Sequence, residues 1–369
     1  MIKTTLFKNK QSLIQLWVIL LVWTTMQFLL FKRYGLTLEG ESIKYFREAE
    51  NFLYQGTFSS PKYWFYSTYI FIHIFFRLIG FETIGVYLFQ SLLNLAGILL
   101  FYKALTKLTR HSWLPFISCL YLCTLFPLQQ FNTYLYTESL FISLSTCWIA
   151  AIIFSENNYR KTLPVILLSA LLLFTRPTGI YFCVITLIWF VLIFFKERRF
   201  LPAGILLIAG SLVTLFVVNK IMQGGGELDF WLPFEEKHIL CGVPTGNLPV
   251  EKQNYQGIGI FFDVFQQQPK AMFQLMLQRA ASFWSTTRDF YSADHNILHM
   301  LWFYPLFLGS LISLRFVRKN ILVQIVLMSA ILFTFSVMLT CDDWMNRFIL
   351  PLIPLLIVTT VIGLKKINN

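Results

Sequence analysis

A series of long apolar runs is the feature that most constrains this fold. A helix of about twenty apolar residues crosses a bilayer core about 30 Å thick. Only 13% of the residues are charged and 56% are hydrophobic, which excludes an ordinary soluble chain. The sequence lacks segments of about ten residues in which polar and apolar positions alternate, which is the pattern of a membrane β-barrel strand. We therefore predict an all-α polytopic membrane protein. The apolar runs cover residues 12–31, 64–80, 82–102, 113–131, 137–154, 162–175, 177–195, 201–219, 297–314, 321–340 and 348–364.

The basic residues predict the topology. The net charge is +12, but most Lys and Arg flank apolar runs, and no nucleic-acid motif is present. If each basic cluster is cytoplasmic, the spans from residue 113 onward alternate without conflict. Residues 64–102 must then cross an odd number of times, so we predict that 64–80 is re-entrant or juxtamembrane and that 82–102 crosses. The clusters are Lys103/Lys107/Arg110, Arg160/Lys161, Lys196/Arg198/Arg199, Arg315/Arg318/Lys319 and Lys365/Lys366.

This topology gives ten crossings with both termini inside. The alternative is eleven crossings with one violation of the positive-inside tendency. Lys3, Lys8 and Lys10 precede the first run, which lacks a small-residue cleavage site, and this pattern indicates a retained signal anchor. We expect residues 1–369 to form a single transmembrane domain.

Two outer loops interrupt the runs, at residues 32–63 and 220–296. The first holds four acids within twelve residues and an amphipathic pattern over 42–55, which predicts an interfacial helix ended by Gly56. The second begins with a glycine run at 224–226 and carries an apolar face within 261–284, where Pro269 is suited to a first helical turn. We predict a second interfacial helix there.

Four charged residues from distant segments fall on the predicted outer face: Glu41, Glu138, Arg176 and Arg347. A charge costs about 2.5–3.5 kcal/mol at the centre of a span and less near its ends. Residues that bear part of this cost usually face a cavity, which favours a functional role. The alternative is that they lie in water at the edges of loops.

Other polar residues have simpler interpretations. Asp342 and Asp343 are predicted to lie in a solvated loop between two spans, and His73 to be a packed histidine. A disulfide between Cys241 and Cys341, both predicted outside, is left open. The remaining cysteines, in apolar runs, are expected to be inert packing residues: Cys119, Cys123, Cys147 and Cys183.

Five segments carry a resemblance to a known superfamily. GESIKYFREAENFLYQGTF (40–58) resembles the first outer loop of GT-C glycosyltransferases, in which an acid precedes a Tyr, an Ala and a Gly at similar spacings. YTESLF (136–141) and TRPTGI (175–180) resemble segments of the mannosyltransferase that adds the second mannose of GPI anchors, and of its bacterial relatives. FQQQPKAMFQLMLQRAASFW (265–284) resembles a helix of protein-mannosyltransferase-like enzymes. NRFILPLIP (346–354) resembles the start of a terminal span.

The resemblance implies a polytopic enzyme that uses a polyprenyl-phosphate sugar. In such an enzyme a carboxylate deprotonates the acceptor hydroxyl as that hydroxyl attacks the anomeric carbon, which inverts it. Arginine matches the oxygens of the departing phosphate. The resemblance assigns Glu41 as general base, with Glu138 positioning the acceptor, Glu41 or a metal. Arg347 is the leading candidate for binding the donor phosphate, and Arg279 and Arg176 rank behind it. The implied substrate-binding residues are Glu39, Tyr45, Tyr136 and Trp284.

Glu41 departs from the family pattern, because the acid at this place is usually Asp. A displacement of about 1 Å can cost roughly 10²-fold in rate. The chain therefore compensates through its backbone, uses Glu39 instead, or has lost activity. No cofactor is required by the sequence, although a divalent metal could be held by Glu41, Glu138, Asp342 and Asp343.

The expected partners are the lipid-linked donor, a lipid, glycan or protein acceptor, and membrane lipid. The expected location is a bacterial inner membrane with the site on its periplasmic face. A flippase or transporter is one alternative, but it would more often show repeats or broken helices at the membrane midplane. A polymerase of lipid-diphosphate glycans is another, for which Arg279, Arg288 and Arg347 would serve the phosphates.

Overall fold

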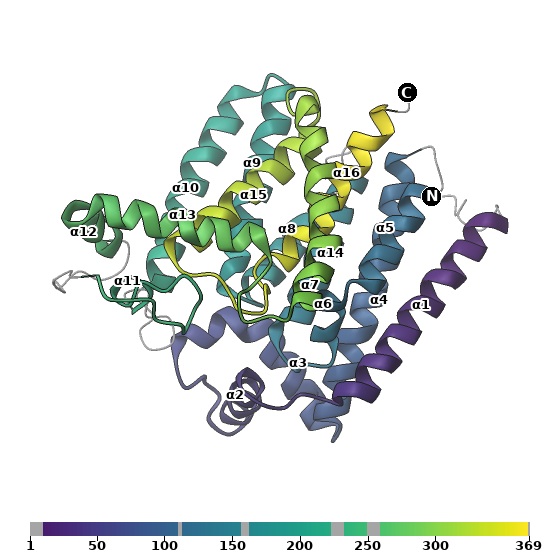
Figure 1. Cartoon of the computed structure of the whole chain (residues 1–369), viewed down its shortest axis with the longest axis horizontal. Coiled ribbons are helices and arrows are strands. Elements are labelled where there is room, and N and C mark those ends of the chain that lie inside the picture. Colours follow the sequence, from purple (N-terminus) through teal and green to yellow (C-terminus); the bar gives the residue numbers. More distant parts are fainter. Residues whose placement is uncertain (1–9, 110–112, 156–161, 223–231, 249–258, 368–369) are drawn as a thin grey trace. The chain divides into compact units, whose positions relative to one another are not determined.

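The computed structural model describes residues 10–109, 113–155, 162–222, 232–248 and 259–367 (Figure 1). Within these ranges the regular structure is helical, and β pairing consists of two isolated bridges. Some residues of the sequence predictions lie outside the described ranges: Lys3, Lys8, Arg110, Arg160, Lys161 and the glycine run 224–226.

In the described part of the chain, seven helices are long and apolar enough to cross a membrane, and a bent pair makes an eighth. The pair is α5 (Trp113–Thr124) followed by α6 (Phe126–Gln129) and η2 (Gln130–Asn132), with a bend of 60°. This confirms an all-α polytopic membrane protein. The seven are α1 (Lys10–Tyr34), α4 (Glu82–Leu108), α7 (Thr137–Ser155), α9 (Ile180–Lys196), α10 (Phe200–Met222), α14 (Ala293–Ser313) and α15 (Ile321–Leu339).

The predicted number of crossings, ten or eleven, is higher than this count. Two of the predicted spans form shorter apolar helices, α8 (Leu163–Leu173) and the segment Leu350–Lys365, which contains η7 and most of α16 (Ile353–Ile367). The 11 residues of α8 extend about 16 Å at 1.5 Å per residue, little more than half of a bilayer core. Residues 64–80, which were predicted not to cross, contain the end of η1 (Pro61–Tyr66) and the whole of α3 (Ser67–Leu78). Helix α3 has 12 residues.

The helices group into two compact units. Unit 1 contains Met1–Arg176, Gly309–Ser313 and Ile353–Asn369, and unit 2 contains Pro177–Leu308 and Leu314–Leu352. The expectation of a single transmembrane domain with two outer loops stays a prediction.

Unit 1 is built around α7, which packs against α4, α8 and α16. Almost every residue of α7 is buried, including its serines and threonines. A Cβ on Gly97 of α4 would lie 3.3 Å from the carbonyl oxygen of Ser143, so glycine allows the two helices to approach closely. Ser143 donates to the carbonyl of Ser139 at 2.7 Å, which satisfies its hydroxyl inside the unit.

The helix predicted over residues 42–55 is present, while its position at the membrane interface stays a prediction. It is α2 (Glu41–Gln55), and Gly56 ends it in the left-handed conformation, with φ of 70°. Tyr45 and Ala49 lie on its buried face, one turn apart. In Figure 1, α2 is seen nearly end-on whereas α1 runs along its length in the same view, so α2 lies across the direction of that span.

Unit 2 contains α9, which packs against α10 and α15. Only 6% of the apolar window of α10 is buried, as expected for a helix that faces lipid. The predicted second interfacial helix is divided into α12 (Gly259–Gln267) and α13 (Pro269–Ser285). The break falls at Gln268, because the residue before a proline is disfavoured in the α conformation. Figure 1 shows α13 running across the direction of α10.

A disulfide joins Cys241 to Cys341 in unit 2, so the pairing left open by the sequence is present. The two Cα atoms lie 5.2 Å apart. Beside the disulfide, the Cys241 amide donates to the carbonyl of Asp342, and the Asp342 amide donates to the carbonyl of Ile239, both at 2.8 Å. The second outer loop is thereby tied to the segment that follows α15.

Candidate functional site

The start of α2 is held against the segment that leads into α7. The Thr37 amide donates to the Thr133 carbonyl at 3.0 Å, and Thr37 forms a parallel bridge with Tyr134. Further along, the Tyr136 hydroxyl donates to the Glu39 carbonyl at 2.9 Å. Two segments about a hundred residues apart thus run together into the helices that carry Glu41 and Glu138.

Glu138 lies in the first turn of α7, and its side chain is 1% exposed. Arg176 donates through Nη1 to Glu138 Oε1 and forms an ion pair with it. The Thr137 hydroxyl donates to the other carboxylate oxygen at 3.4 Å. A buried carboxylate requires such compensation, so in this structure Arg176 neutralises the charge of Glu138.

Tyr45 is buried one helical turn after Glu41. Burial raises the pKa of Tyr45 well above its usual value, and the carboxylates of Glu41 and Glu138 raise it further, whereas the Arg176 guanidinium lowers it. Burial also raises the pKa of Tyr136, again with contributions from Glu41 and Glu138. Both phenols therefore stay protonated and can donate hydrogen bonds near neutral pH.

Unit 1 thus gathers six of the nine predicted site residues into one neighbourhood, named here the acidic cluster. The Glu39 side chain is exposed, while its carbonyl accepts from Tyr136 and, at 3.1 Å, from the Ser42 hydroxyl. Glu41 is partly buried. The members of the acidic cluster are Glu39, Glu41, Tyr45, Tyr136, Glu138 and Arg176.

The other three predicted residues lie in unit 2, and two of them are occupied by protein groups. Arg279 is completely buried and donates to three main-chain carbonyls, those of His238 and Pro233 at 2.6 Å and that of Met338 at 3.2 Å. Burial lowers the pKa of Arg279 to about 9. Trp284 donates through its indole N–H to the Thr334 hydroxyl at 2.9 Å. Arg279 and Trp284 therefore both have a structural role in unit 2.

Arg347 is the third predicted residue, and its side chain is 19% exposed. Its Nε donates to Asp343 Oδ2 at 2.7 Å, four residues earlier in the sequence. The Met345 amide donates to the other Asp343 oxygen at 2.8 Å. Asp343 therefore orients the Arg347 guanidinium, and the side chain stays partly exposed.

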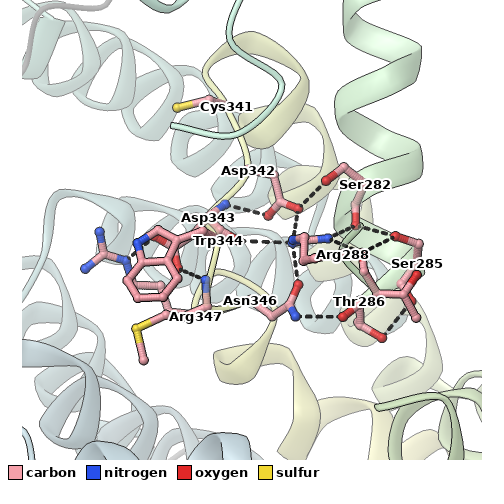
Figure 2. Close-up of polar contacts among 12 residues, drawn as sticks. Ser282, Ser285, Thr286, Arg288, Cys341, Asp342, Asp343, Trp344, Asn346 and Arg347 are labelled. Atoms are coloured by element: carbon pink, nitrogen blue, oxygen red, sulfur yellow. Dashed lines mark hydrogen bonds and ion pairs between the residues drawn. The ribbon is translucent and has the colours of Figure 1, made fainter. Parts of the chain in front are cut away.

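A cluster around Arg288 was missed by the sequence prediction (Figure 2). Arg288 Nη2 donates to Asp342 Oδ2 at 2.6 Å, to the Asp343 carbonyl at 3.0 Å and to Asn346 Oδ1. Its Nη1 donates to the carbonyl of Ser282 at 3.0 Å. Figure 2 shows this guanidinium in the middle of the contacts, and we name the group the Arg288 cluster.

The prediction that Asp342 and Asp343 lie in a solvated loop is wrong. Both side chains are 1% exposed, and each is paired with an arginine. Burial raises the pKa of Asp342, while Arg288 and the Ser282 hydroxyl act in the opposite direction. The missed signal was the sequence DDWMNR between two apolar runs, because three charges so close to spans require buried partners.

Two further side chains hold the first outer loop. Glu48 is buried and accepts from the Ser59 amide at 2.9 Å and from the Asn51 side chain at 3.1 Å, a structural role that the sequence prediction did not assign. His73 is fully buried between aromatic rings, with Nδ1 3.3 Å from Glu82 Oε1, in agreement with its prediction as a packed histidine.

Metal ligands do not gather among the described residues, where no group of three His, Cys, Asp or Glu side chains is arranged to hold an ion. Three of the four carboxylates that could have supplied ligands are paired with arginines instead: Glu138, Asp342 and Asp343. The fourth carboxylate of that set is Glu41, which belongs to the acidic cluster and is partly buried.

The described helices make up an all-α polytopic membrane protein. The structure resembles the crystal structure of ArnT from Cupriavidus metallidurans bound to undecaprenyl phosphate, with a TM-score of 0.53 and 12% sequence identity. The likeness covers 96% of this chain and 60% of the ArnT chain. At this identity it shows the fold alone. No family model and no curated protein matches the sequence.

Proposed function

We propose that this chain is a membrane glycosyltransferase that moves a sugar from a polyprenyl-phosphate donor to a lipid, glycan or protein acceptor. The observation that carries the proposal is the acidic cluster, which brings Glu41, Glu138 and Arg176 together from three distant segments of a GT-C-like fold. The undecaprenyl phosphate bound to ArnT supports the choice of lipid carrier. A mannose-like hexose is the sugar that the sequence motifs favour.

In this proposal Glu41 is the general base. It takes the proton of the acceptor hydroxyl as the acceptor oxygen bonds to the anomeric carbon, and the sugar–phosphate bond breaks with the electron pair leaving on the lipid phosphate. Direct displacement inverts the anomeric carbon. Glu138 is assigned a positioning role within the acidic cluster, because its side chain is 1% exposed and its carboxylate pairs with Arg176.

Arg347 remains the leading candidate for the donor phosphate. Its side chain is 19% exposed and is oriented by Asp343. Arg279 is set aside because it is completely buried and its donors are used by three carbonyls. Arg176 ranks behind Arg347 because its side chain is less exposed, at 12%. Arg288 is likewise buried among protein acceptors, which weakens the case for a polymerase that needs several arginines at a diphosphate.

Purified full-length protein in lipid nanodiscs tests the proposal with a panel of radiolabelled polyprenyl-phosphate sugars. We expect one donor to bind and its label to move to an acceptor in crude membrane extract, with release of the lipid phosphate. Binding of a lipid-diphosphate glycan alone would replace this proposal with the polymerase or flippase. Binding of no lipid-linked sugar would reject all three.

A further inference from the structure

The contact between Tyr136 and residues 39–40 lies immediately before both carboxylates of the acidic cluster. Glu41 follows Gly40 directly, and Glu138 comes two residues after Tyr136. Consecutive Cα atoms are only about 3.8 Å apart, so the contact fixes the starting points of both side chains. The Leu135 amide adds a bond to the Thr37 carbonyl at 3.4 Å.

Gly40 is required at this contact for two independent reasons. Its φ of +62° is in the left-handed region, which glycine adopts at no steric cost. A Cβ at this position would also lie 2.9 Å from the Tyr136 hydroxyl oxygen, closer than a Cβ normally approaches. The backbone here is therefore shaped around the Tyr136 hydroxyl.

The Tyr136 hydroxyl holds the main chain directly before Gly40. It donates to the Glu39 carbonyl at 2.9 Å. Gly40 is the N-cap residue of α2 and has no side chain that could cap the helix, so this contact ties the start of α2 to a distant segment of the chain.

We propose that Tyr136 and Gly40 form a clamp that sets the position of Glu41 relative to Glu138, with Tyr136 as a positioning residue rather than a substrate ligand. The inference rests on the proposed function for its kinetic consequence, because a carboxylate displaced by about 1 Å can lose roughly 10²-fold in rate. The clamp also offers a physical answer to the longer side chain of Glu41, since it fixes the backbone from which that side chain extends.

Tyr136→Phe removes the hydroxyl and keeps the ring. We expect kcat to fall at least about tenfold with KM within about threefold, because the base is displaced while the binding groups stay. Tyr134→Phe is the matched control, since Tyr134 is the neighbouring tyrosine whose ring packs against Tyr136 at 5.3 Å between centroids. It should leave both constants unchanged. Unchanged kcat in Tyr136→Phe, or an equal loss in Tyr134→Phe, overturns the clamp.

Gly40→Ala supplies the second test. Alone it should reduce kcat, because its Cβ meets the Tyr136 hydroxyl. Combined with Tyr136→Phe, which removes the atom that it meets, it should be no slower than Gly40→Ala alone. Multiplicative losses in the double variant would mean that the two residues act separately.

Hydrogen exchange of the Glu41 and Ser42 amides tests the clamp without an activity assay. We expect exchange to become at least tenfold faster in Tyr136→Phe and to stay unchanged in Tyr134→Phe. If wild-type protein transfers no sugar but this result appears, the proposed function fails and the clamp stands as a structural contact. If transfer occurs and exchange is unchanged in Tyr136→Phe, the clamp fails and the proposed function stands.

Discussion

Replacement of Arg288 by Met tests the energetics of the Arg288 cluster. Methionine keeps much of the side-chain volume but removes the charge and all five N–H donors. The Arg288 and Asp342 side chains are 3% and 1% exposed, so water cannot replace the lost partner. Asp342 would retain only the Ser282 hydroxyl and its neighbouring backbone amide as donors.

The expected loss follows from leaving a buried carboxylate without its cation. Removing one partner of a buried ion pair costs about 3–5 kcal/mol, compared with about 0–1 kcal/mol for an exposed pair. We therefore expect Arg288→Met to lower the free energy of unfolding by about 3–5 kcal/mol at pH 8. Arg199→Met is the matched control, because its pair with Glu197 spans 3.8 Å between two exposed side chains.

The loss should shrink as the pH falls. Burial already raises the pKa of Asp342, and removing Arg288 removes the main opposing charge. A carboxyl whose folded-state pKa exceeds its unfolded-state value adds stability at low pH, and this contribution disappears as the pH rises through the folded-state pKa. In the variant, mild acid protonates Asp342 and removes the uncompensated charge, so the gap to wild type should be smaller at pH 5 than at pH 8.

Denaturant titration in a mild detergent measures these free energies. The double variant Arg288→Met/Asp342→Leu should lose less than the sum of its single variants, because both charges leave together. A loss below about 1 kcal/mol for Arg288→Met would refute the claim that this pair is buried and energetically coupled. Additive losses, or a gap that widens in acid, would refute the assigned cause.

The remaining predictions concern the proposed site and the disulfide. Glu41→Gln should abolish transfer and leave donor binding nearly intact, since the amide cannot accept the proton; radiolabel transfer within a few-fold of wild type removes Glu41 from the base role. Arg347→Ala should weaken donor binding measured by titration, whereas Asp343→Asn should have a smaller effect because it only loosens the orientation of Arg347; unchanged affinity in Arg347→Ala removes Arg347 from the phosphate. Without reductant, Cys241 and Cys341 should resist maleimide labelling of denatured protein and should label after reduction; labelling of both without reduction contradicts the disulfide.

Hydropathy predicted the helices well because lipid removes the alternatives. A backbone in hydrocarbon must satisfy its own hydrogen bonds, so each apolar run becomes a helix. The ends of α2 were also readable, because Gly56 and the amphipathic spacing are local signals. The count of crossings was less readable, because run length does not reveal the 60° bend after α5 or the short extent of α8.

The acidic cluster was partly readable for a different reason. Charge is so costly near a span that Glu138 and Arg176 stand out from their apolar neighbours. What the sequence could not supply was their pairing, which turned a predicted phosphate ligand into the partner of a carboxylate. Arg279 shows the same limit, since only packing reveals the three carbonyls that occupy it.

The sequence by itself determined that this chain is a helical membrane protein and marked the polar residues for which burial would need a reason. These properties follow from hydrophobicity and local backbone preference, which act over a few residues. The tertiary structure decided which charges neutralise one another, that Asp342 and Asp343 are buried, and that Tyr136 shapes the backbone at Gly40. Those outcomes depend on contacts between segments as much as a hundred residues apart, where distance and desolvation, rather than sequence spacing, set the energy.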